Sequence, residues 1–138
     1  MEKIGVSACL LGIHCKYNGG HNLNLNVLKA LLGKEMVLIC PEIMGGLPTP
    51  RIPSEIQADG RLINQNNEDV TKAFDLGKHI SLKKLKENQV NKVILKDGSP
   101  SCGYQTIYDG SFSQKKIPGQ GVTAKFLLSN KIEVLDIQ

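Results

Sequence analysis

Aromatic residues and long apolar runs are scarce in this chain of 138 residues. It contains three Tyr, three Phe and no Trp, too few to build the stacking platform on which single-stranded nucleic acids bind. No stretch reaches the roughly 18 consecutive apolar residues of a membrane-spanning helix, so we expect no membrane partner. The net charge of +4 is mild, and many of the lysines surround one expected helix and the strand after it. A solvated face explains that pattern, and we expect no nucleic-acid polymer as a partner.

Zinc-finger and secretion signals are also missing. The chain has four cysteines, but no Cys-x-x-Cys pair and no finger-like Cys/His spacing, which argues against a structural zinc site. The N-terminal Met-Glu-Lys-Ile-Gly-Val leads directly into an expected strand and lacks the organisation of a signal peptide. We therefore expect a cytoplasmic protein whose cysteines stay reduced rather than forming disulfides.

Length and composition suit one domain, residues 1–138, without repeats or linkers. Short apolar runs bounded by loop residues alternate with segments in which apolar residues recur at helical spacing. These patterns predict strands over 3–9, 36–40, 92–96 and 133–137, and helices over 22–33, 67–88 and 122–129, with Asn22 capping the first helix. Residues 41–56 and 97–103 are predicted to be loops, and Asp59-Gly60 and Asp109-Gly110 each predict a tight hairpin turn.

Strands that alternate with helices favour an α/β fold. We expect a small Rossmann-like parallel sheet of about four strands, in the order 2-1-3-4, with flanking helices and functional loops at one edge. Ligands of such sheets bind beyond the carboxyl ends of the strands. Cys9 ends the first expected strand, Cys40 ends the second, and Cys102 lies shortly after the third. The three cysteines should therefore meet at one edge of the sheet.

Three thiols that converge in this way favour a functional site over three unrelated core residues. Thiolates are soft ligands suited to iron–sulfur clusters, zinc or copper(I). Cys15, six residues after Cys9, can complete a four-thiolate site, surround such a site, or belong to the core. If only three cysteines bind a metal, one coordination position stays open, as catalysis requires.

Polar residues beside two of these cysteines are candidate catalytic groups. Glu42 follows Cys40 by two residues, and a carboxyl group there can transfer protons. Ser101 directly precedes Cys102, so we expect its hydroxyl in the same site, where it can orient a substrate or relay a proton. No histidine lies near Ser101 in the sequence, which weakens the interpretation as a Ser-His-Asp hydrolase.

Five residues are predicted to bind the substrate. Arg51 stands in a loop stiffened by prolines and suits holding an anion or the polar edge of a base. Gly45 and Gly46 would let the backbone approach a ligand closely, and we expect Ser7 and Ser99 to contribute from the other two loops.

Several segments of the chain together resemble the thiouracil desulfidase family. They include Val6-Ser-Ala-Cys-Leu-Leu-Gly12, Cys15-Lys-Tyr-Asn-Gly19, Cys40-Pro-Glu-Ile-Met-Gly-Gly-Leu-Pro-Thr-Pro-Arg51, Ser99-Pro-Ser-Cys-Gly103 and Pro118-Gly-Gln-Gly-Val-Thr123. The resemblance covers nearly the whole chain. It implies a [4Fe–4S] cluster held by Cys9, Cys40 and Cys102, with the fourth iron free to bind the sulfur of a thiolated base. It also implies that Glu42 and Ser101 are the catalytic pair.

The expected activity is that of an iron–sulfur-dependent desulfidase, which removes sulfur from a small thiolated nucleobase or nucleoside such as a thiouracil. In this hypothesis the open iron acts as a Lewis acid on the bound sulfur, while Glu42 activates the water that replaces it. The residues alone leave two alternatives: a non-catalytic thiol- or metal-binding module, and a zinc-dependent hydrolase that uses the same cysteines. They leave monomer and homodimer equally open.

Overall fold

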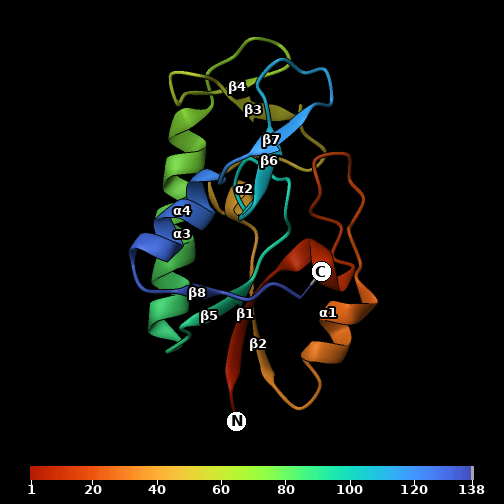
Figure 1. The fold of residues 1–138 in the computed structure, drawn as a ribbon, viewed down its shortest axis with the longest axis vertical. Coiled ribbons are helices and arrows are strands. Elements are labelled where there is room, and N and C mark those ends of the chain that lie inside the picture. Colours follow the sequence, from red (N-terminus) through yellow and green to blue (C-terminus); the bar gives the residue numbers. More distant parts are fainter. Residues whose placement is uncertain (138) are drawn as a thin grey trace.

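Four parallel strands form the central sheet in the order β2-β1-β5-β8, which confirms the expected order (Figure 1). The computed structural model describes residues 1–137. The sheet consists of β1 (Lys3–Ser7), β2 (Glu35–Ile39), β5 (Lys92–Ile94) and β8 (Glu133–Val134). β1 is the central strand: its whole length pairs with β2, from Lys3 opposite Glu35 to Ser7 opposite Ile39, and its other edge pairs with β5.

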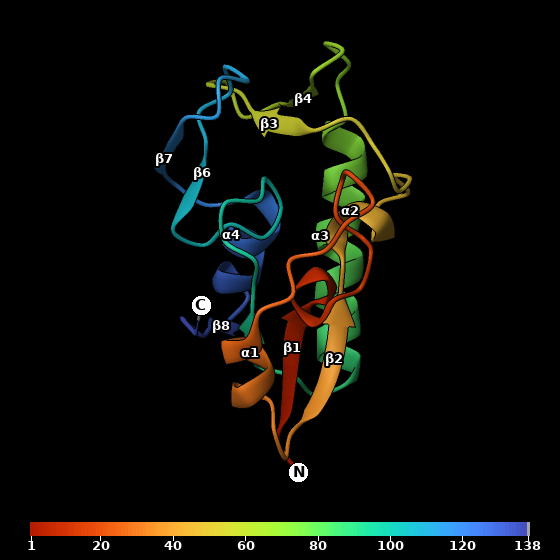
Figure 2. The same ribbon diagram turned by 90° about the vertical axis from the view of Figure 1, so that its right-hand side faces the viewer.

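Side chains alternate between the two faces of the sheet, as buried parallel strands require. On one face, β1 packs against α1 (Leu25–Ala30) and the 3-10 helix η1 (Ala8–Leu11). On the other face, β2 and β5 pack against α3 (Thr71–Glu87) and α4 (Val122–Ser129). Figure 2 shows β1 between α1 and α3. Because both faces are covered by helices, only the ends of the strands are left for a functional site.

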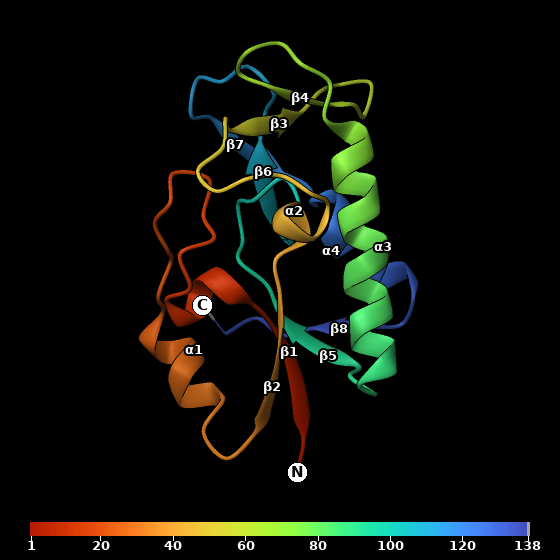
Figure 3. The same cartoon turned by 180° about the vertical axis from the view of Figure 1, so that it is seen from behind.

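A short helix, α2 (Pro41–Met44), opens the segment that was predicted to be a loop. Proline at the first helical position already has the φ angle that a helix needs, so Pro41 ends β2 and starts α2 at once. Figure 3 shows α2 at the upper end of β2, beside α3. The two helices touch at glycines: a Cβ atom on Gly45 would lie 1.9 Å from the carbonyl oxygen of Ala73, and one on Gly77 would lie 1.9 Å from that of Pro41. Glycine at both positions therefore sets the place of α2.

Two small hairpins stand beyond the carboxyl end of the sheet (Figure 1). They are β3 (Ser54–Ile56) with β4 (Leu62–Asn64), and β6 (Thr106–Tyr108) with β7 (Lys116–Pro118). Both expected turns, at Asp59-Gly60 and Asp109-Gly110, lie between paired strands. The second connection is longer than a tight turn, because the strands that it joins end at Tyr108 and begin at Lys116.

Several boundaries differ from the predicted ones. β1 ends at Ser7 rather than Cys9, because the chain turns into η1. The first helix begins after Asn24, whose side chain accepts a hydrogen bond from the backbone N–H of Val27 at 3.1 Å. Asn22, predicted to be the cap, instead directs its side-chain amide at the sulfur of Cys9. No helix within residues 1–137 combines the length and apolar character needed to cross a membrane.

Candidate functional site at the carboxyl edge of the sheet

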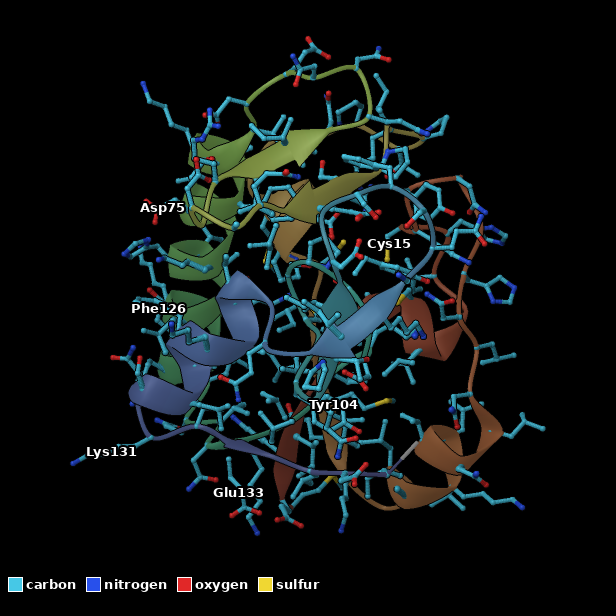
Figure 4. The ribbon with its side chains drawn as sticks, turned by 45° about the horizontal axis from the view of Figure 1, so that its top comes forward. Cys15, Asp75, Tyr104, Phe126, Lys131 and Glu133 are labelled. Atoms are coloured by element: carbon cyan, nitrogen blue, oxygen red, sulfur yellow. The ribbon has the colours of Figure 1, made fainter. Side chains whose placement is uncertain are left out.

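The four cysteines line one cavity of about 670 Å³ at the carboxyl edge of the sheet. Cys9 lies in η1 directly after β1, Cys40 caps α2 directly after β2, and Cys102 lies in the loop that follows β5. All four are free thiols. In Figure 4, Cys15 lies in the upper part of the molecule, between the N-terminal loop and the two hairpins. The structure thus brings together three loops that are far apart in the sequence.

The thiols differ in how readily they ionise. A hydrogen bond with the thiol of Cys15 is the main cause that lowers the pKa of Cys9 to about 6 and that of Cys40 to about 7. Cys9 is also stabilised as a thiolate by the side-chain amide of Asn22, 3.4 Å from its sulfur. The same contacts raise the pKa of Cys15, so Cys15 is the proton donor of the group. Burial raises the pKa of Cys102 to about 12, so we expect Cys102 to ionise only beside a cation.

Glu42, in the first turn of α2, is held between Arg51 and Ser101. Its Oε1 atom accepts a hydrogen bond from Nε of Arg51 at 2.9 Å, and its Oε2 atom accepts one from Oγ of Ser101 at 2.8 Å. The side chains of Arg51 and Glu42 are only 7% and 15% exposed. A carboxylate with one oxygen on a cation and the other on a hydroxyl is fixed in orientation and connected to a proton carrier.

Arg51 fastens two loops together. Its Nη2 atom donates to the carbonyl oxygen of Cys15 at 2.8 Å, and Nη1 donates to the carbonyl oxygen of Pro48 and the hydroxyl of Thr49. With Nε on Glu42, each of its three nitrogens has a protein acceptor. Arg51 also lines the cavity, so it braces the Cys15 and Glu42 loops, and its substrate-binding role stays a prediction.

The loop after β5 is held mainly by hydrogen bonds in which at least one partner is a backbone group. Asp97 Oδ1 accepts hydrogen bonds from three successive backbone N–H groups, those of residues 104–106, each at 3.0 Å. The N–H groups at the start of α4 donate to the carbonyl oxygens of Pro100 and Ser101. A Cβ atom on Gly121 would lie 2.6 Å from the carbonyl oxygen of Ser101, so glycine is needed for this approach. The start of α4 therefore holds the Ser101–Cys102 loop.

The potential metal ligands that line the cavity include four cysteine thiols, which are soft ligands. Within residues 1–137, no three His, Cys, Asp or Glu side chains are grouped so as to hold a single metal ion. The thiols of Cys9, Cys40 and Cys102 instead come from three separate strand ends around one cavity. Cysteine thiolates are the usual ligands of iron–sulfur clusters.

A sequence model of the 2-thiouracil desulfurase family matches residues 4–138. The chain belongs to this family. It is 43% identical over 131 residues to the uncharacterized protein YbbK of Bacillus subtilis (strain 168), an alignment that covers 88% of this chain and 87% of YbbK. Among solved structures, the fold is similar to that of the [4Fe-4S]-dependent thiouracil desulfidase TudS, with a TM-score of 0.91 and 40% identity. That match covers 98% of this chain and 90% of TudS.

The other predicted site residues of this 2-thiouracil desulfurase family member divide into two groups. Ser7 and Ser99 line the cavity, and Ser7 also accepts a hydrogen bond from the backbone N–H of Lys96 at 2.9 Å. Gly45 and Gly46 are not among the lining residues. Gly45 faces α3, so its lack of a side chain serves helix packing rather than approach to a ligand.

One part of the cavity wall is not predicted by the sequence patterns. It carries three lysines and three aromatic rings, from Lys16, Tyr17, Lys96, Tyr108, Phe112 and Lys116. Glu55 also lies in this wall, but its Oε1 atom accepts hydrogen bonds from the backbone N–H groups of Gly110 and Phe112. This part of the wall thus combines cationic and flat apolar side chains. The sequence does place Tyr108 and Phe112 around a predicted turn, but nothing in it directs that turn over the cysteines.

Proposed function

We propose that this protein is a [4Fe–4S]-dependent desulfidase that converts a thiouracil-like base into the corresponding oxo base and releases sulfide. The observation that carries the proposal is the meeting of three strand-end cysteines with the Glu42–Ser101 pair in one cavity. Membership of the 2-thiouracil desulfurase family and the likeness to TudS support it. The substrate that we propose is a small thiolated pyrimidine, whose ring suits an aromatic-lined cavity.

The thiolates of Cys9, Cys40 and Cys102 would hold the cluster, and this chain fits that role. Two of these thiols have lowered pKa values, and cysteine must be deprotonated to bind iron. When bound, a cluster with three protein ligands would supply Lewis-acid chemistry to the thiocarbonyl group. Cys15 is the proton-donating neighbour of two ligands and is not required as a fourth.

Glu42 is the base of the proposed reaction. Overall, one water replaces one sulfur: the C=S bond of the base is lost, a C=O bond forms, and the two protons of the water leave with the sulfur as hydrogen sulfide. Glu42 takes a proton from the attacking water, which makes the water oxygen nucleophilic. Arg51 keeps the carboxylate oriented before this step through the hydrogen bond from its Nε atom.

Ser101 is the second proton carrier. Its hydroxyl is 2% exposed and donates to Oε2 of Glu42 at 2.8 Å. Because it stands beside Cys102, it can carry a proton between Glu42 and the departing sulfur. Glu42 and Ser101 together therefore connect the attacking water, which loses a proton, to the departing sulfur, which gains one.

Anaerobic reconstitution with iron and sulfide tests the proposal, followed by incubation with 2-thiouracil and with 4-thiouridine. We expect the broad visible absorption of a [4Fe–4S] cluster and release of sulfide together with the oxo base. The Cys102→Ser variant, treated in the same way, should give neither. The proposal is wrong if the reconstituted wild-type protein holds iron but releases no sulfide from either compound.

A further inference from the structure

Ser99 lies behind Ser101 in the same hydrogen-bonded chain. Its Oγ atom accepts the backbone N–H of Ser101 at 3.1 Å and that of Cys102 at 3.0 Å. It also lies 2.9 Å from Oγ of Ser101. One hydroxyl thus touches the backbone of a proposed ligand and the side chain of a proposed proton carrier.

These contacts decide which hydroxyl donates to which. A serine oxygen has two lone pairs and one hydrogen, and both lone pairs of Ser99 are occupied by backbone N–H groups. The hydroxyl hydrogen of Ser99 must therefore point away from these two N–H groups, and its acceptor is Oγ of Ser101 at 2.9 Å. The hydrogen of Ser101 has two acceptors in reach, Oε2 of Glu42 at 2.8 Å and Sγ of Cys102 at 3.8 Å, and it is directed to the nearer one, Glu42. The chain has a single direction, from Ser99 through Ser101 to the carboxylate.

We propose that Ser99 is a positioning residue, which holds the Ser101 hydroxyl with its proton directed at Glu42. This inference rests on the proposed desulfidase function. It replaces the substrate-binding role that the sequence predicts for Ser99, because an oxygen with both lone pairs occupied has none left to accept a hydrogen bond from a base.

Three variants separate positioning from the other roles. Ser99→Thr keeps the hydroxyl and should keep activity near the wild-type level. Ser99→Ala removes it, and kcat should fall about tenfold, the lower end of the usual effect of outer-shell partners, with KM changed less than twofold. Ser99→Asp keeps oxygens that accept both backbone N–H groups but offers no hydrogen to Ser101. The Ser101 proton then turns toward the new carboxylate, and kcat should fall at least as far as in Ser99→Ala.

The Asp variant is the critical one, because it preserves the loop. If Ser99 only caps the backbone, Ser99→Asp retains the wild-type kcat, and the proposal is overturned. A rise in KM at constant kcat in Ser99→Ala overturns it in favour of substrate binding. Iron content is measured for each variant, so that loss of the cluster is not mistaken for loss of positioning.

A crystal structure of the reconstituted Ser99→Asp protein, grown without oxygen, gives a readout independent of turnover. We expect the Ser101 hydroxyl to leave Glu42 and contact the new carboxylate, while the backbone of residues 99–103 stays in place. A Ser101–Glu42 distance equal to that of the wild type contradicts the proposal. If the wild-type enzyme releases no sulfide, only the proposed function is contradicted. The position of the Ser101 hydroxyl in the crystal structure is observed without substrate and tests the role of Ser99 separately.

Discussion

The loops after β2 and β5 each carry a cysteine and a residue that we propose transfers protons, but they are fixed by different means. The first loop, residues 40–51, depends on side chains: Arg51 joins Glu42 to the carbonyl oxygen of Cys15, and two glycines set the place of α2. In the second, residues 97–103, the bonds go to backbone groups: Ser99 Oγ accepts N–H groups within the loop, Asp97 Oδ1 accepts those of residues 104–106, and the start of α4 donates to loop carbonyl oxygens. Single substitutions should therefore disturb the first loop more than the second.

The largest effect on kcat is expected at Glu42, the proposed base, which the first loop carries. Glu42→Gln keeps the size of the side chain but removes the base, and kcat should fall about 10²–10⁴-fold, the usual contribution of a general base. Steady-state sulfide release checks this, with the exposed Glu87→Gln as the matched control. A kcat within threefold of the wild-type value would show that another group removes the proton.

Removal of the Arg51 brace should cost the most stability. Arg51→Gln leaves the largely buried carboxylate of Glu42 and the carbonyl oxygen of Cys15 without their cation, and the loss of one partner of a buried pair costs about 3 kcal/mol. Urea unfolding of the cluster-free protein measures the loss. Arg61→Gln, which breaks an exposed pair with Asp59, is the control and should leave the midpoint unchanged. Equal effects of the two variants would refute the role of Arg51 as a brace.

Gly77→Ala tests the helix contact that positions α2. In an ordinary helix interior this change stabilises by about 1 kcal/mol. Here the new Cβ atom would lie 1.9 Å from the carbonyl oxygen of Pro41, so we expect a net loss of about 1–3 kcal/mol. Because α2 carries Glu42, kcat should fall as well. Thermal unfolding measures the change, and a stabilised variant would contradict the close approach.

The smallest effect is expected in the second loop, at Asp97. Burial opposes ionisation there, but backbone N–H groups of residues 98 and 104–106 more than offset it and hold the pKa of Asp97 below its usual 3.8. A lowered pKa in the folded state adds stability above about pH 4, and this stability is lost as the pH falls below 3.8. The stability difference between wild type and Asp97→Asn should therefore be present at pH 6 and shrink toward pH 3. Melting temperatures across that range test it, and a constant difference would contradict it.

Much of the framework is predictable from the sequence because its signals are local. Short apolar runs ended by Pro41 or by the glycine-rich loop after β5 fix the strand ends, and parallel strands bring such ends together. The meeting of Cys9, Cys40 and Cys102 follows from this, and the order β2-β1-β5-β8 is the one expected for this α/β pattern.

The contacts between loops were not predictable, because no periodic pattern encodes them. A stiff loop with one arginine looks like an anion site, but only the fold shows that Arg51 turns to Cys15, which is 36 residues away. Gly45 looks like a residue that lets a ligand approach, whereas the structure places it against α3. Asn22 looks like a helix cap, but it contacts Cys9. Each of these residues has its role through a partner remote in sequence.

The central claim is that the three strand-end cysteines, without Cys15, hold a [4Fe–4S] cluster beside Glu42. Iron content after anaerobic reconstitution tests it most directly, measured side by side for the wild type, Cys102→Ser and Cys15→Ser. The account predicts the iron of one cluster per chain in the wild type and in Cys15→Ser, and loss of that iron in Cys102→Ser. Full iron content in Cys102→Ser, or its loss in Cys15→Ser, would contradict the claim.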